Sequence, residues 1–548
     1  MVEVLYEESK SSWYLFLLAL TYGGLQFSWS VELAYGSPFL LSLGISKSLL
    51  AFVWIAGPLS GTLVQPYIGI RSDKSRSRFG KRRPFMIGGA IATAISLMLL
   101  AWTVEIVSGF LHACGVAKDS HGTKIAAIVF AVLMIYVLDF SLNVIQAGCR
   151  AFIVDRAPTH QQDDANAWAA RLGSIGNILG YLAGYVNLPR HFWWLGSTQF
   201  KVLCAFACFC LAVTVTLSCM IIGEEDARLE GQPREKEGLF TLFAQLWRSV
   251  RKLPLQVKRV CIVQFFAWIG WFPYLFYLTT YVGELHVDPI FRRNPHMTDE
   301  EIDAAWNTGT RLGTLALFIF AVATFAASIG LPFIVASMEN PPTGSDGRRT
   351  HVGLRVPNLS RHTSTAVQHN SRRTSDSHCG RFKMPSLEIR WLTLRRVWFL
   401  SHLLFALLMW LTFAVKTTLS ATILAAFVGI PWAVTNWVPF ALIAAEISRR
   451  DVERQQLRRA SHISTVESLA DTGVADKAGV VLGIHNVAIA APQVIATLVS
   501  SLIFRFLQRP RGSMGDNSVA WVLRFGGVCA LIAAWMTRRV FEDARRGR

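Results

Sequence analysis

Long apolar runs alternate with shorter polar connections along the whole chain. A helix needs about 20 mostly apolar residues to cross the hydrocarbon core of a bilayer, and twelve runs meet this requirement. They cover approximately residues 13–35, 48–70, 84–107, 125–153, 166–188, 201–222, 259–283, 309–336, 397–415, 420–446, 477–504 and 519–540. The pattern predicts an all-α membrane protein with twelve transmembrane helices. No cleavage site follows the first run, so we expect it to be a retained helix and not a signal peptide.

The composition supports this class. Of the 548 residues, 52% are hydrophobic and 16% are charged, which is too apolar for a soluble protein of this size. We find no glycine loop for nucleotides, no cluster of metal ligands and no triad-like arrangement. The sequence therefore predicts a protein that is not an enzyme and has no cofactor and no bound metal.

The formal net charge of +18 is carried mainly by the connections between the apolar runs. Cytoplasmic loops of membrane proteins are enriched in Lys and Arg. The connection between the first and second runs has Lys47 as its single basic residue. The connection between the second and third runs is strongly basic, with Arg71, Lys74, Arg76, Arg78, Lys81, Arg82 and Arg83. This asymmetry predicts that both termini are cytoplasmic, and we expect no binding to nucleic acid.

A polar segment with the sequence GEEDARLEGQPREKEG divides the predicted helices into two groups of six. We therefore expect two six-helix bundles, at residues 1–222 and 259–548, joined by a cytoplasmic linker at residues 223–258. This division is usual in major facilitator transporters, whose halves surround a central site. Residues 337–396, which are rich in Ser, Thr, Arg and Gly, are expected to form a disordered cytoplasmic loop.

Two of the cytoplasmic connections contain the pattern Arg-Arg-x-Ser, at Arg372 to Ser375 and at Arg458 to Ser461. Basophilic kinases read this pattern, so Ser375 and Ser461 are candidate phosphorylation sites. The alternative is that both loops are solvated tethers, because such short motifs arise by chance in Arg/Ser-rich segments. The sequence does not indicate an oligomeric state.

The fourth apolar run carries a polar stripe: around a helix, Asn143, Gln146 and Arg150 all lie within about 40° of Asp139. An aspartate at mid-membrane costs roughly 2.5–3.5 kcal/mol, so this edge belongs in a bundle interior or a wet cavity. In one interpretation Asp139 exchanges a proton and Arg150 holds a polar substrate or a second carboxylate. In the other, each is neutralised by another helix and only fixes packing.

The polar stripe and several other segments along the chain resemble the sucrose transporter family, within the major facilitator superfamily. The resemblance is carried by GPLSGTLVQPYIGIRSDKSRSRFGKRRPFMIGG (57–89), DFSLNVIQAGCRAFIVD (139–155), ANAWAARLGSIGNILGYLAG (165–184), QFFAWIGWFPYLFYLTTYVGE (264–284), GIPWAVTNWVPFALIAAE (429–446) and GVVLGIHNVAIAAPQ (479–493). It implies proton-coupled import of sucrose or another α-glucoside, maltose included, across the plasma membrane, with Asp139 as the proton-carrying carboxylate and Arg150 as its functional partner. The long Arg/Ser loop is similar to fungal members more than to plant ones.

This chain departs from the plant members of the family at three positions. It has Lys47 where they carry His, and Leu278 and Thr280 where they carry acidic residues. These differences bear on which disaccharide is preferred and leave the class of transporter unchanged.

A sugar site needs groups that hydrogen-bond hydroxyls and flat apolar surfaces for the sugar rings. Polar and aromatic residues inside the predicted helices supply both. The candidate substrate-binding residues are Gln26, Trp29, Asn143, Gln146, Asn177, Gln264, Trp268, Trp271, Asn436, Asn486 and Gln493, with Tyr22, Tyr274, Tyr277 and His485 nearby. The alternative for each aromatic residue is a role in packing or as an interface anchor.

The connection SDKSRSRFGKRRP predicts a gate on the cytoplasmic side. Asp73 could meet basic groups or a helix N-terminus of the facing bundle, and Arg83 could take part; the alternative is that the basic residues only set topology. Glu32, Glu284, Arg311 and Glu446 also lie at or inside span limits, either as gate or ion-pair partners or at headgroup level, and we expect Glu446 at the cytoplasmic end.

Two other functions remain open at this stage. A facilitator would use the same pocket without protons, and a sugar-sensing receptor would bind sugar and signal through its long basic loops with little flux. An internal membrane such as that of the vacuole is an alternative to the plasma membrane.

Overall fold

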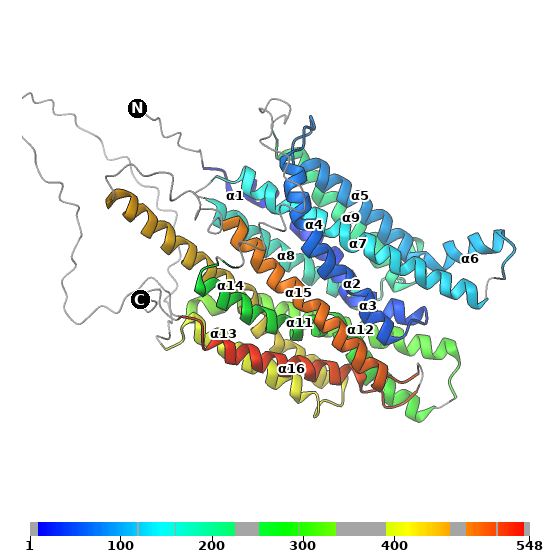
Figure 1. The fold of residues 1–548 in the computed structure, drawn as a ribbon. Coiled ribbons are helices and arrows are strands. Elements are labelled where there is room, and N and C mark those ends of the chain that lie inside the picture. The colour runs from blue at the N-terminus through cyan, green and yellow to red at the C-terminus, as the bar shows by residue number, and fades with distance from the viewer. Residues whose placement is uncertain are drawn as a thin grey trace, which may run out of the picture.

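The computed structural model describes residues 9–117, 120–158, 161–224, 253–294, 296–335, 391–460, 478–510 and 513–541, with the single residues 251 and 389. Within these residues all the regular elements are helices, apart from one isolated bridge between Val335 and Ile389. The elements are α1 (Ser12–Ala19), α2 (Thr21–Ser42), α3 (Lys47–Val53), α4 (Ala56–Asp73), α5 (Arg83–Ala101), α6 (Thr103–Ala113), α7 (His121–Arg156), α8 (Gln162–Tyr185), η2 (Trp193–Leu195), α9 (Gln199–Ile221), α11 (Leu255–Arg293), α12 (Asp299–Ile334), α13 (Leu394–Leu411), α14 (Thr418–Ala460), α15 (Ala478–Leu507) and α16 (Ser518–Thr537) (Figure 1).

The predicted all-α class is confirmed for the described residues, and each of the twelve apolar runs lies on helix. Three runs are interrupted: α1 and α2 divide near Leu20, α3 and α4 divide near Trp54, and Trp102 alone separates α5 from α6. Prolines, in contrast, break none of the long helices. Pro273, Pro431 and Pro492 lie inside α11, α14 and α15.

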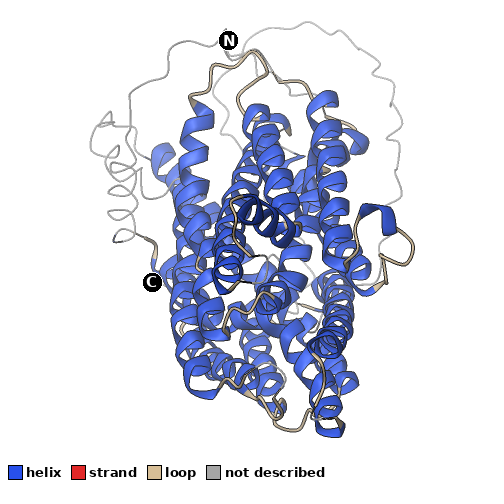
Figure 2. Ribbon diagram, turned by 90° about the vertical axis from the view of Figure 1, so that its right-hand side faces the viewer, coloured by secondary structure: helices blue, strands red, loops and turns tan. Residues whose placement is uncertain are grey.

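Ten helices of the described chain are long and apolar enough to cross a bilayer. The runs at 13–35 and 166–188 are not among them. α2 is rich in Gly and Ser and contains Glu32, and α8 begins with Gln162, Asp163 and Asp164. Their composition suits burial among other helices better than contact with lipid. Figure 2 shows the parallel arrangement of the long helices.

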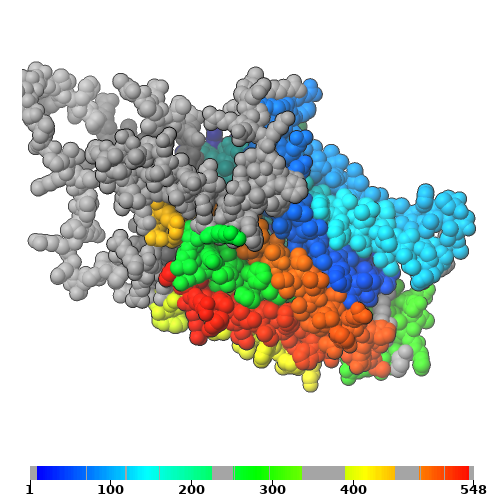
Figure 3. Space-filling view, in the orientation of Figure 1, coloured from blue at the N-terminus to red at the C-terminus, as the bar shows by residue number. Residues whose placement is uncertain are grey.

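The helices pack as two halves, α1–α9 and α11–α16 (Figure 1). In the first half, α2 lies against α8 and α9, α5 against α7 and α9, and α4 against α7. In the second half, α11 lies against α12, α15 and α16, while α14 lies against α12 and α13. The two halves meet along α8 with α12, α2 with α11, and α3 and α4 with α15. Figure 3 shows the last contact on the surface, where orange α15 adjoins the blue segment.

Glycines allow the closest helix contacts. A side chain at Gly176 of α8 would overlap the backbone of Gly23 in α2, and one at Gly180 would overlap the Ser30 side chain. Gly270 of α11 and Gly526 of α16 meet in the same way. Gly176 and Gly180 therefore allow α8 to pack closely against α2.

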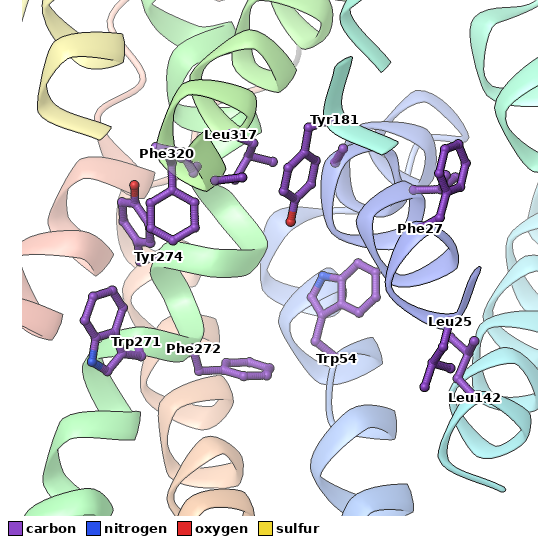
Figure 4. Close-up of a cluster of buried hydrophobic side chains, with 14 of the residues drawn as sticks. Leu25, Phe27, Trp54, Leu142, Tyr181, Trp271, Phe272, Tyr274, Leu317 and Phe320 are labelled. Atoms are coloured by element: carbon purple, nitrogen blue, oxygen red, sulfur yellow. The ribbon is translucent and has the colours of Figure 1, made fainter. Parts of the chain in front are cut away.

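Aromatic side chains fill the contact between the halves. The ring centroids of Trp54 and Phe276 are 4.6 Å apart, and the Trp54 indole donates a hydrogen bond of 3.0 Å to Ser37 Oγ. Figure 4 shows Trp54 with Phe272 on one side and Leu25 and Leu142 on the other. This packing fixes the rotation of α3 and α4 against α2 and α11.

Several expectations fall on residues outside the described ranges. These are the candidate phosphorylation sites Ser375 and Ser461, most of the linker at 223–258, and most of the loop at 337–396.

Candidate functional site

Asp139 lies in the middle of α7 and is buried, with 4% of its surface exposed. It faces neighbouring helices and not lipid: a side chain built on Gly57 of α4 would lie 3.7 Å from Asp139 Oδ1. The Glu32 carboxyl group of α2 interacts with it directly. No Lys or Arg of the described chain forms an ion pair with either carboxyl group. The bundle interior therefore shields Asp139 from hydrocarbon and leaves it without a cation.

The next polar residues of the stripe form an amide network with α4. Asn143 donates to Ser60 Oγ at 2.8 Å and to the Asp139 carbonyl at 2.9 Å. The amide of Gln65 donates to Asn143 Oδ1 at 2.7 Å and also to Gln146. Asn143 and Gln146 are thus held in place by protein partners next to the acidic pair.

Arg150, at the end of the stripe, is exposed to solvent. Its guanidinium group lies beside the Tyr22 hydroxyl of α2 and near His485 of α15. Arg150 is eleven residues from Asp139, about 16 Å along the helix. It therefore faces the space between the two halves and does not neutralise Asp139.

The second half contributes polar atoms that have no partner in the described chain. Gln264 Nε2 lies 3.5 Å from His485 Nε2, while Gln264 Oε1 is buried and unpaired. The indole N–H of Trp268 is also buried and unpaired, and its ring centroid is 5.7 Å from that of Trp432. The hydroxyl groups of Tyr274 and Tyr277 are also buried and unpaired, and in the first half Asn177 Oδ1 of α8 is as well. Such groups can form hydrogen bonds with a polyhydroxylated ligand.

The remaining candidate binding residues differ in their surroundings. Gln26 is half-buried and packs against Gly173 of α8, and Trp29 is half-buried. Asn436 is exposed and donates to the Trp432 carbonyl at 3.0 Å, and Asn486 and Gln493 are half-buried on α15.

Trp271 does not join this group. It is 1% exposed, and its ring lies 4.0 Å from that of Phe405 in α13. These contacts favour the packing interpretation of Trp271, because, unlike the equally buried Tyr274 and Tyr277, it has no atom among the buried polar groups that lack a partner in the described chain.

Charged residues join the two halves at one end of the molecule, which we call the closed end. Lys47 at the start of α3 forms ion pairs with Glu284 of α11 and with Asp516, the latter at 2.7 Å. Asp516 precedes α16. Burial by itself raises the pKa of Asp516, but the Lys47 ammonium group and hydrogen bonds from Lys47, Ser518 and the backbone outweigh it, so the pKa is lowered.

Neighbouring polar contacts complete the closed end. Ser48 Oγ lies 3.0 Å from Ser501 Oγ of α15, and Arg311 of α12 donates to the Tyr185 carbonyl of α8 at 2.9 Å. Ser37 Oγ donates to the Phe276 carbonyl at 2.9 Å. Glu284 is therefore an ion-pair partner between the halves, and Arg311 also joins the halves, through a hydrogen bond to a backbone carbonyl.

The opposite end carries the basic connection and no hydrogen bond between the halves in the described residues. Asp73 pairs with Arg82, which also binds Asp155 at 2.7 Å and Ser72. Burial by itself lowers the pKa of Arg82, but Asp155 and Asp73 outweigh it and raise the pKa. Glu446 pairs with Arg449 and Arg450 on α14.

This arrangement differs from the expected cytoplasmic gate. Asp73 contacts its own half and not the facing bundle, and its partner is Arg82 and not Arg83. Arg83 instead donates to the Ile222 carbonyl. The physical reason is position: Arg82 precedes the first turn of α5 and lies between the ends of α4 and α7, whereas Arg83 points toward the end of α9.

Sequence reasoning missed three features of this site. Gln65 and Ser60 were not singled out, although a glutamine within an apolar run is a signal. Glu32 was identified as a charge inside a span but without its partner Asp139. The Lys47–Asp516 pair has no local signal, because 469 positions separate the two residues.

Comparison with known proteins gives a consistent result. The profile of the Major Facilitator Superfamily matches residues 14–342. The General alpha-glucoside permease of Schizosaccharomyces pombe is 36% identical over 557 residues, covering 97% of this chain and 94% of the permease. Sucrose transport protein SUT1 of Oryza sativa subsp. japonica is 29% identical over 327 residues, covering 56% of this chain and 59% of that protein.

Solved structures share the fold. The D-xylose-proton symporter matches with a TM-score of 0.53 at 15% identity, covering 97% of this chain and 99% of the other. The nucleoside transporter NupG, as its D323A mutant, matches with a TM-score of 0.55 at 11% identity and the same coverage.

Proposed function

This chain belongs to the Major Facilitator Superfamily, and from that premise we propose that it is a symporter that imports sucrose or a related α-glucoside together with protons. It is an integral membrane protein. Similarity to an α-glucoside permease along nearly the whole chain supports the substrate class. The buried, unpaired hydrogen-bonding atoms of Gln264, Trp268 and Asn177 are suited to sugar hydroxyl groups.

The observation that carries proton coupling is the environment of Asp139. Its carboxyl group is buried inside the first half, faces protein and has no basic partner in the described chain. This carboxyl group can therefore bind and release a proton during transport. A carboxyl group in a permanent ion pair with an arginine would stay ionised. One charge that crosses 100 mV gains about 2.3 kcal/mol, which corresponds to roughly fiftyfold accumulation before any pH gradient is added.

We place the chain in the plasma membrane with twelve spans and both termini in the cytoplasm. α1–α2 and α3–α4 each count as one span, and α1–α2 and α8 are the two spans that are added to the ten apolar helices. The Lys/Arg-rich connection before α5 belongs to the cytoplasmic side. The closed end at Lys47 then faces outward, and the end that carries Asp73 and Arg82 faces the cytoplasm.

Transport would require the closed end to separate. The ion pairs of Lys47 would break, α3 and α4 would move away from α15, and contacts would form at the opposite end, as in alternating access of two bundles. Asp73 and Arg82 sit at that end, so we assign them to the inner gate. Arg83 supports the gate through α9.

The test is uptake by a transport-deficient yeast that expresses this chain. Labelled sucrose, maltose and trehalose are offered while the external pH is recorded. We expect accumulation of at least one of these sugars with alkalinisation of the medium. Asp139→Asn should abolish concentrative uptake while the protein still reaches the membrane. Uptake by the unaltered protein that persists after collapse of the proton gradient indicates a facilitator, and sugar binding without flux indicates a receptor.

A further inference from the structure

The first half contains two acidic side chains in mutual contact, and both are buried. Glu32 of α2 and Asp139 of α7 are each 4% exposed. Both carboxyl oxygens of Glu32 and Oδ2 of Asp139 are enclosed and receive no hydrogen bond from the described chain. Asp139 Oδ1 lies over Gly57, where the missing side chain leaves room for a carboxyl group. Two acids thus share one site that provides no N–H or O–H donor.

The charged residues on the surrounding helices do not neutralise this site, because they are engaged elsewhere. Three of them form ion pairs: Lys47 with Glu284 and Asp516, Arg82 with Asp73 and Asp155, and Lys201 with Glu105. The other three make different contacts: Arg311 binds the Tyr185 carbonyl, Arg171 stacks on Trp168, and Arg150 lies beside Tyr22. Two phenols are close: Tyr136 lies near Asp139, and the Tyr35 hydroxyl group donates to the Gly184 carbonyl at 2.6 Å. Among the described residues, the charged group that acts on Glu32 is Asp139, and the reverse also holds.

Two ionised carboxylates in contact and away from water repel each other strongly, and neither could satisfy the other. One proton removes the repulsion and creates the missing donor, because a carboxylic acid donates to a carboxylate. Two acids that interact this directly bind their protons as a unit. A single proton therefore satisfies the site, whereas two negative charges would require the site to open to water.

We infer that Glu32 and Asp139 hold one proton between them, so that Glu32 is the second half of the proton-binding site. The inference rests on the proposed function and deepens it. The proton enters from the outer side when the closed end separates, forms an O–H bond with either carboxyl group and leaves to water on the cytoplasmic side. No other bond forms or breaks. Glu32 raises the proton affinity of the site through its charge, while Asp139 remains the acid that faces the polar stripe.

The test compares three variants in the same yeast, with uptake measured from external pH 4 to 8. Glu32→Gln keeps the shape but removes the second charge, so we expect the pH of half-maximal uptake to move in the acidic direction by one unit or more. Glu32→Asp keeps the charge and should restore the position of the original curve. Glu105→Gln, in the partly exposed pair with Lys201, is the matched control and should leave both rate and pH profile unchanged.

A purely structural role for Glu32 predicts a lower maximal rate without movement of the pH profile, and that result would overturn the inference. If Glu32→Gln shows no net uptake, sugar binding to the purified protein is measured by calorimetry across the same pH range. An acidic shift in the binding curve supports the shared proton, and an unmoved curve overturns it. Absence of proton-linked uptake in the unaltered protein contradicts the proposed function instead, so the two failures are distinguishable.

Discussion

Lys47 at the start of α3 forms an ion pair with Glu284 of α11, 237 positions further along the chain. The same ammonium group binds Asp516, which precedes α16. One lysine of the first half therefore holds two acids of the second half at the closed end. The ammonium group of a lysine stays charged at neutral pH.

Replacement of Lys47 by Met should weaken the closed end. The two acids, with side chains 9% and 12% exposed, would be left without their cation, and removal of one partner from a buried pair costs about 3–5 kcal/mol. We expect the variant to favour separation of the halves at this end and to import sugar more slowly. A cysteine placed at Ser48, in a Cys114→Ser background, should react faster with an impermeant maleimide. Lys124→Met, at an exposed position of α7, serves as the control. Equal labelling of the Ser48 cysteine in the parent protein, in Lys47→Met and in Lys124→Met contradicts the prediction.

The contribution of Asp516 to the closed end should be insensitive to external pH between about 5 and 7. The pKa of Asp516 is lowered by Lys47 when the end is closed, so closure favours the ionised carboxyl group. This contribution is fully present above the ordinary pKa of an aspartate, about 3.9, and is lost as the pH falls through the lowered pKa. With Glu284, the other acid bound to Lys47, replaced by Gln, the Ser48 cysteine should therefore label at a constant rate from pH 7 to 5 and faster below about pH 4. Asp516→Asn should label quickly at every pH; a protein that loosens already between pH 7 and 6 would rule out Asp516 as the controlling group.

Arg82→Lys should destabilise the inner end of the first half. The Arg82 guanidinium group binds Asp73, Asp155 and Ser72 together, and a lysine ammonium group cannot reproduce this planar, forked geometry. We expect a loss of about 1.5–3 kcal/mol, typical of one hydrogen bond to a charged group, which is measurable as a lower unfolding temperature in detergent. Arg78→Lys, in the same connection and stacked on Phe79, is the comparison. Similar stability of both variants would show that the charge alone suffices.

Gly176→Ala should disrupt the contact between α8 and α2. The added methyl group would overlap the backbone of Gly23, which cannot move aside as a flexible side chain could. A lower yield of folded protein and a lower unfolding temperature are expected. Gly88→Ala is the matched control, because a methyl group at Gly88 of α5 meets nothing within 4 Å. If the two substitutions have equal effects, the helices are not in the close contact described.

The sequence by itself determined where the helices are and which family the chain resembles. A helix in a bilayer must satisfy its own backbone hydrogen bonds and cover itself with apolar side chains, so each span leaves a local record in about 20 consecutive residues. The polar stripe of Asp139, Asn143, Gln146 and Arg150 is equally local, because four residues on one helix share a face whatever surrounds them. The apolar composition is weakest in α2 and α8, because other helices cover them and they therefore contain more Gly and polar residues.

Only the tertiary structure decided which polar groups meet. The partner of Asp139 is Glu32 and not Arg150, the partners of Lys47 lie on α11 and before α16, and Arg82 instead of Arg83 holds Asp73. Each of these pairings depends on how far a helix is rotated and shifted against its neighbours. Contacts such as Gly176 against Gly23 set that rotation and shift, and they join residues that are far apart in the chain and therefore leave no pattern within any one segment.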